Sequence, residues 1–192
     1  HLFGSCFGER GGNVLASCAG VYPPIGSESS PIIQFLDSVG QNEAAGKCLN
    51  FFFGREKENG FIQNICGYML ENGATLYNES LHYAYSRDKK QLAENFGKIK
   101  KATSYVLGWI DRNKNDKPFG YGMIDGQVAD PEDTFRSYAL NAFAYAGLRG
   151  AAELYEAFGE GKDETERVKR YADELSENIR KAYKTALKRA PL

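Results

Sequence analysis

The chain has 192 residues, 42% hydrophobic and 13% aromatic, enough to bury a core within one domain. Its 24 basic and 25 acidic residues leave a net charge of −1, which provides no field to attract nucleic acid or anionic lipid. No apolar stretch approaches the roughly 20 residues that span a bilayer, so we expect neither a nucleic-acid nor a membrane partner. The start at His1 lacks a signal-peptide pattern, and we expect a fragment or processed part of a larger protein, with its localisation unknown.

The first predicted helical hairpin covers about residues 30–54. Ser30 precedes Pro31 as an N-cap precedes a proline at the first helical position, and apolar residues then repeat at helical spacing. A second helix follows from Glu43 and stops at Gly54. Within it Cys48 is expected to pack in the core.

The second predicted hairpin covers about residues 73–113. Its first helix runs through 74–85, and Asp88 is placed to cap a long amphipathic helix that carries Trp109 as a structural residue. Glu79 and His82 lie one turn apart on the first helix, which favours a surface pair or a core histidine over acid-base work.

The third predicted hairpin covers about residues 131–188. Asp130 resembles an N-cap before a proline, and the helix that follows is apolar on most faces until Gly159 stops it. The last helix, from about 164 to 188, opens with Asp163 and Glu166 at capping-box spacing. Its predicted buried face includes Tyr183. No segment reads as a convincing strand.

The predicted fold is therefore all-α, with three helical hairpins in series, each introduced by a loop rich in glycine and aromatic residues. Repeats of this kind bury their faces by stacking on neighbours, so an open row leaves two uncovered ends. We expect further hairpins from the same polypeptide or from another chain. The four cysteines form no C-x-x-C pair, which argues against a zinc site, and a bridge between Cys6 and Cys18 is left open.

Three segments resemble the six-hairpin glycosidases, the (α/α)6 toroid glycoside hydrolases that include α-L-rhamnosidase-like and glucoamylase-like enzymes. They are VYPPIGSE (21–28), GYMLENGA (67–74) and YALNAFAY (138–145). The resemblance implies that residues 1–192 form about half of a toroid catalytic domain. It also implies a sugar site at the loops, an oligosaccharide or glycoside substrate, inverting hydrolysis and no cofactor. The rest of the domain, or a second copy of the chain, would complete the ring. Tyr77 stands where such enzymes often have tryptophan.

Glycoside hydrolysis needs a carboxylic acid to protonate the leaving oxygen and a carboxylate to activate water or attack the sugar. Glu71 is the first candidate, because aromatic neighbours could raise its pKa; a plain helix-start acid is the alternative. Glu28 holds the equivalent place in the first loop, although capping would also explain it. Asp125 lies in a glycine-flanked loop, where a turn-forming role explains it equally well.

The same loops hold candidate substrate-binding residues. Tyrosines offer flat faces and hydroxyls to sugars, amides offer hydrogen bonds, and Arg136 beside Asp133 could bind a substrate acid or form an intrahelical ion pair. The set is Tyr22, Asn64, Tyr68, Tyr77, Tyr121, Gln127, Asp133 and Arg136. The alternative functions are a polysaccharide lyase or sugar epimerase on the same fold, for which His82 is the only internal histidine, and a non-catalytic helical-repeat scaffold.

Overall fold

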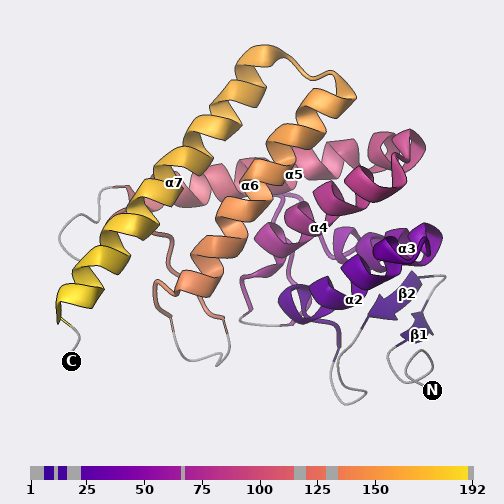
Figure 1. Cartoon of the computed structure of the whole chain (residues 1–192), viewed down its shortest axis with the longest axis horizontal. Coiled ribbons are helices and arrows are strands. Elements are labelled where there is room, and N and C mark those ends of the chain that lie inside the picture. Colours follow the sequence, from indigo (N-terminus) through magenta and orange to yellow (C-terminus); the bar gives the residue numbers. More distant parts are fainter. Residues whose placement is uncertain are drawn as a thin grey trace.

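The computed structural model describes residues 7–10, 13–16, 23–65, 68–114, 120–128 and 134–189. Within these ranges six α-helices form three helical hairpins in series, which confirms the predicted all-α class (Figure 1). The hairpins are α2 (Gly26–Ser38) with α3 (Asn42–Phe53), α4 (Glu71–Ser86) with α5 (Lys89–Asn113), and α6 (Tyr138–Phe158) with α7 (Lys162–Arg189).

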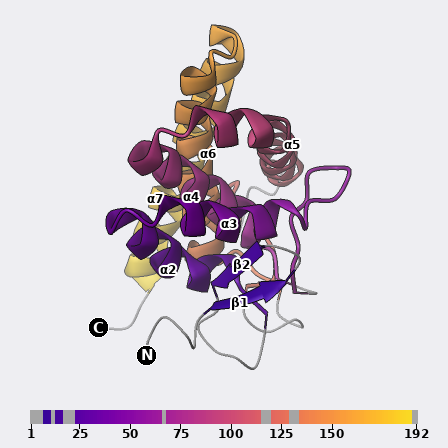
Figure 2. The ribbon, with the colours of Figure 1, turned by 90° about the vertical axis from the view of Figure 1, so that its right-hand side faces the viewer.

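One element was not predicted. Strands β1 (Phe7–Arg10) and β2 (Asn13–Ala16) form an antiparallel pair in which Phe7 lies opposite Ala16. The pair lies beside the first hairpin, where β2 contacts α3 and α2 (Figure 2). The sequence between the strands is Gly11-Gly12, and two glycines between short runs are a hairpin signal that helical periodicity does not reveal.

The first helices of the three hairpins form a row in which α4 occupies the middle. It packs against α2 on one side and α6 on the other, and also contacts α3 and α5. A continuous apolar core joins all three hairpins; its fully buried members include Ile33, Leu49, Leu76, Ile99, Leu148 and Val168. Placing α4 at the centre of this core fixes the position of its first residue, Glu71.

Glycines allow the backbones of α4 and α6 to approach closely. A Cβ atom added at Gly73 would lie 2.5 Å from the carbonyl carbon of Phe143, and one at Gly147 would lie 2.6 Å from the carbonyl oxygen of Gly73. At the start of α2, a Cβ at Gly26 would lie 3.0 Å from that of Ala74. The starts of α2 and α4 are thus held in contact, and α6 crosses α4 within the same turn.

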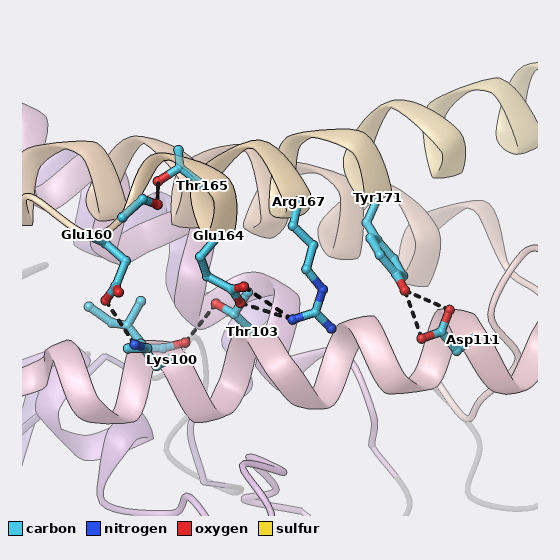
Figure 3. Close-up of polar contacts among 10 residues, drawn as sticks. Lys100, Thr103, Asp111, Glu160, Glu164, Thr165, Arg167 and Tyr171 are labelled. Atoms are coloured by element: carbon cyan, nitrogen blue, oxygen red, sulfur yellow. Dashed lines mark hydrogen bonds and ion pairs between the residues drawn. The ribbon is translucent and has the colours of Figure 1, made fainter.

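Polar contacts join α5 to the first half of α7 and to the turn that precedes it (Figure 3). Lys100 pairs with Glu160 at 2.9 Å, and the Tyr171 hydroxyl donates to the Asp111 carboxylate at 2.9 Å. Partly exposed pairs of this kind contribute little stability each, roughly 0–1 kcal/mol. They fix the orientation of α7, whereas the buried face of Val168, Ala172 and Leu175 holds it in place.

Several helix boundaries differ from the predicted ones. α2 begins at Gly26, so Ser30 is inside the helix, where its hydroxyl donates to the Gly26 carbonyl. The reason is the packing of Gly26 on α4, which no local signal announces. α7 begins at Lys162, which places Asp163 in its first turn instead of at the cap, and Tyr183 is 53% exposed instead of buried.

The start of α6 is also different. The helix begins at Tyr138, and Ser137 is its N-cap, accepting a hydrogen bond from the Leu140 N–H. The proposed cap at Asp130 lies outside the described residues. Arg136 therefore precedes the helix instead of standing in its first turn, because the neighbouring Phe135 pairs with Gly126 as an antiparallel bridge.

Other local predictions are confirmed. The Asp88 carboxylate accepts hydrogen bonds from the Lys90 and Gln91 N–H groups at 2.9 and 3.0 Å. Gly159 ends α6 in the left-handed conformation, with φ of 88°. Trp109 and Cys48 are buried in the core.

The close approach of α4 and α6 predicts that Gly73→Ala and Gly147→Ala are each destabilising by roughly 1–3 kcal/mol, because the added methyl group meets backbone atoms that cannot move aside. Thermal unfolding measures the loss. Gly97→Ala in α5 is the matched control: nothing lies within 4 Å of its added Cβ, and it should stabilise the helix by roughly 0.5–1 kcal/mol. Equal melting temperatures for all three variants would contradict the described crossing.

Candidate functional site

The loops that introduce the three hairpins meet at the end of the molecule where α2, α4 and α6 begin. The Asn64 side-chain amide donates to the Pro24 carbonyl, which links the second loop to the first. The Met69 N–H donates to the Gln127 carbonyl at 3.0 Å, which links the second loop to the third. The described parts of all three loops are therefore one hydrogen-bonded surface.

Two fully buried asparagines attach these loops to the helices. Asn72 accepts from the Ile62 N–H at 2.9 Å and donates to the Gly60 carbonyl at 2.7 Å. Asn141 accepts from the Ile124 N–H and donates to the Ile124 carbonyl, both at 2.9 Å. A buried amide with both ends satisfied fixes its partner segment firmly. Sequence reasoning missed both residues, although each lies in the first turn of its helix, next to the loop that it holds.

Glu71 is the first residue of α4 and is fully buried. Neither of its carboxylate oxygens has a well-formed hydrogen bond to a described residue. Burial raises the pKa of Glu71 to about 7, and the backbone N–H of Gly26 offsets only part of that rise. The side chain thus lies against the start of α2 and holds a proton near neutral pH, as a general acid must.

The other two proposed catalytic acids lie on segments attached to the same place. Glu28 is half-buried in the first turn of α2, two residues beyond the Gly26 that packs on Glu71. Asp125 is half-buried beside Ile124, the residue that Asn141 holds. The structure therefore brings the three acid-bearing segments to one end of the row of helices.

The proposed substrate-binding residues divide into separate groups. Tyr121 and Arg136 line one surface pocket of about 510 Å³. Tyr77 lines another, of about 300 Å³ between α4 and α6, and lies about 9 Å along the helix from Glu71 at 1.5 Å per residue. Tyr68 is half-buried immediately before Met69.

Two of the remaining predicted binding residues form hydrogen bonds that join the loops. The Asn64 amide is used to hold Pro24, and the Gln127 backbone carbonyl is used to hold Met69. Tyr22 and Asp133 lie outside the described residues. The structure therefore supports a role for the first two in shaping the loops.

A second buried polar cluster lies further along α4, between the first two hairpins. His82 contacts Asp37 through Nδ1 at 2.8 Å and Gln91 through Nε2 at 3.2 Å, so the core-histidine interpretation is confirmed. Burial alone would lower the pKa of His82, but Asp37, Glu79 and Gln91 together raise it. Burial raises the pKa of Glu79 to about 7, opposed by His82 and Asn95.

The comparisons with known protein families, curated proteins and solved structures gave no match. Within the described ranges, no three His, Cys, Asp or Glu side chains gather as a metal site would require. None of the described helices combines the length and the apolar character needed to cross a bilayer.

The buried acids predict that the protein is less stable at pH 8 than at pH 5. The raised pKa values of Glu71 and Glu79 mean that the unfolded chain ionises these carboxyls between about pH 4.5 and 7 while the folded chain keeps them protonated, so stability falls as pH rises through that window. The pKa of His82 is also raised in the folded chain, so its contribution to stability likewise falls as the pH rises. Each acid contributes up to roughly 3 kcal/mol.

Glu71→Gln and Glu79→Gln should each reduce the difference in melting temperature between pH 5 and pH 8, and the double variant should reduce it further. Glu71→Gln should also raise stability at pH 8, because the amide carries no charge to desolvate. Unfolding curves at the two pH values measure both effects. An unchanged difference in the double variant would show that these carboxyls ionise freely.

Proposed function

We propose that this chain forms part of a glycoside hydrolase, in which Glu71 is the general acid that protonates the leaving-group oxygen. The observation that carries the proposal is the state of Glu71: a fully buried carboxyl with a pKa of about 7, at the end of the row where the loops meet. A carboxyl kept protonated by an apolar setting is what this step requires. The resemblance of the segments around Glu71 to toroid glycosidases supports the same assignment.

The second carboxylate of the proposed reaction is Glu28 or Asp125. In an inverting reaction it accepts a proton from the attacking water while Glu71 donates one to the leaving oxygen. The C–O bond to the leaving group breaks as the C–O bond to the water oxygen forms. Both segments are anchored, Glu28 by the first turn of α2 and Asp125 through Ile124 and Asn141. Since Glu71 is fully buried, a substrate reaches it only when the surrounding loops move.

The proposed enzyme is completed by further hairpins, from the same polypeptide or a second copy of the chain. Both ends of the described row expose large apolar side chains. They are Phe35 on α2, Val39 directly after it, and Tyr138, Tyr183 and Leu187 on α6 and α7, with exposures of 42–57%. Stacking neighbours would cover them, as in other helical repeats.

The structure bears on the lyase or epimerase alternative. Those reactions move a ring proton, and His82 has both ring nitrogens occupied within the buried cluster. A tyrosine would then have to act as the base. A product that absorbs in the near ultraviolet would support a lyase, and sugar binding without turnover would support a scaffold.

The proposal predicts how Glu71→Gln depends on the leaving group. On oligosaccharides and alkyl glycosides, whose leaving oxygen must be protonated, kcat/KM should fall by roughly 10²–10⁴-fold. On dinitrophenyl glycosides, which leave as stable anions, most of the activity should survive. Loss of the base, tested as Glu28→Gln and Asp125→Asn, should instead lower turnover of both substrate types. A panel of glycosides assayed with each variant measures the pattern.

Glu79→Gln is the matched control. Glu79 lies on the same helix, is equally buried and has a pKa raised to about the same value, yet it belongs to the histidine cluster. Its replacement should leave turnover within about twofold. Wild-type turnover of poor leaving groups by Glu71→Gln, or no turnover of any glycoside by the unmodified protein, would overturn the proposed function.

A further inference from the structure

A pocket of about 510 Å³ opens where α7 ends and α6 begins. The loop before α6 contributes Tyr121 and Met123, the start of α6 contributes Arg136 and Tyr138, and the last turns of α7 contribute Thr185 and Arg189. Ala182 and Ala186 lie on the same face of α7, and their small side chains leave the space open. Pockets of this size accept small organic molecules, and an inorganic ion would fill little of the space.

The charged side chains among the described residues that line this pocket are both basic. Its described lining includes two guanidinium groups and no carboxylate. Arg136 already engages another group within the protein, and a guanidinium has five N–H donors with which to bind a further acceptor. Arginine pairs with carboxylates through two parallel hydrogen bonds, which favours a planar oxyanion as the ligand.

The neighbouring pocket shows that this charge is a local property. It shares Tyr121 with the first pocket, has a volume of about 540 Å³, and its charged lining residues are Lys114, Lys181, Glu174 and Glu177. The mixture of signs there gives no preference for an anion. Of the two hollows beside Tyr121, only the one with Arg136 and Arg189 has a lining of basic charge alone among its described residues.

Two tyrosines give the pocket flat walls. Tyr121 adopts the left-handed conformation with φ of 51°, which a non-glycine residue rarely takes and which often marks a functional position. Tyr138 packs edge-on against Tyr183, at 6.0 Å between ring centroids. Such rings provide an apolar face for a sugar ring and hydroxyls for its oxygens.

The pocket is connected to the proposed acid through the loops. Phe135, next to Arg136, pairs with Gly126. The following residue, Gln127, accepts the hydrogen bond from Met69, two residues before Glu71. The pocket and the acid thus belong to the same loop surface at the same end of the hairpins.

We propose that this pocket binds a uronic acid unit of an acidic glycan, with Arg136 and Arg189 on its carboxylate and Tyr121 and Tyr138 on its ring. The inference rests on the proposed function, because it names the substrate class of that site. A polymer with a uronic acid in this pocket would extend along the loops towards Glu71.

Calorimetric titration tests the pocket by itself. The probes are trimers of galacturonate and of glucuronate, each compared with its methyl ester, which has the same rings without the charge. At least one acidic trimer should bind about tenfold or more tightly than its ester, and its affinity should fall with added salt. Arg189→Gln should weaken acidic binding by about ten- to a hundredfold, and the Arg136→Gln, Arg189→Gln double variant should abolish it.

Arg180→Gln is the matched control, since it removes the same charge from an exposed position on α7 that does not line the pocket. It should leave the affinity within about twofold. Equal binding of acid and ester, no effect of Arg189→Gln, or binding of inorganic phosphate as tight as that of the trimers would overturn the pocket proposal.

The two proposals fail separately. Glu71→Gln should retain binding of the acidic trimer while it loses turnover of poor leaving groups. Charge-dependent binding that Arg189→Gln removes, in a protein without turnover, would support the pocket and reject the hydrolase. Turnover that depends on Glu71, without any preference for acidic sugars, would support the hydrolase and reject the pocket proposal.

Discussion

The close contact between α4 and α6 is the constraint on which the candidate site depends. Gly73 and Gly147 bring two helix backbones together, and only residues without a side chain permit that distance. Glu71 and Asn72 immediately precede Gly73, so the same contact fixes the acid and the amide that holds the second loop. On the other helix, Asn141 lies within two turns of Gly147 and holds the third loop. Loop geometry is thus set by helix packing.

Two buried glutamates on α4 show why burial alone does not identify a functional acid. Glu71 and Glu79 are both almost inaccessible, and burial raises the pKa of each to about 7. Glu79 has the polar partners His82 and Asn95, although its Oε2 also lacks a well-formed bond to a described residue, and it lies between two packed hairpins. Glu71 lies beside the loops, and its oxygens lack well-formed bonds to the described residues. A buried carboxyl without hydrogen-bond partners lowers the stability of the fold. Packing gives no reason to keep such a group where the loops meet, and this favours a functional role.

The sequence predicts the helices well and their contacts poorly. Periodicity and the local signals at Asp88 and Gly159 placed most of α5 and the end of α6, because those signals act within a few residues. The predicted start of α2 was wrong, because the helix begins where Gly26 packs against α4. Asn72 and Asn141 were missed for the same reason: their partners lie 10 and 17 residues away in loops without periodicity. Residue type and loop position identified the candidate acids, but the sequence could not predict how deeply each of them is buried.

The distribution of charge at the loop end fits a division of roles between an acid and an anion pocket. The pKa of Glu71 is raised by burial and lowered only by the Gly26 N–H, so no charged side chain of the described residues sets it. A guanidinium beside Glu71 would favour the carboxylate and lower that pKa. Arg136 and Arg189 instead lie at the foot of the third hairpin. In the proposed site, an anionic sugar bound there would leave the proton on Glu71, whereas a guanidinium shared with Glu71 would remove it.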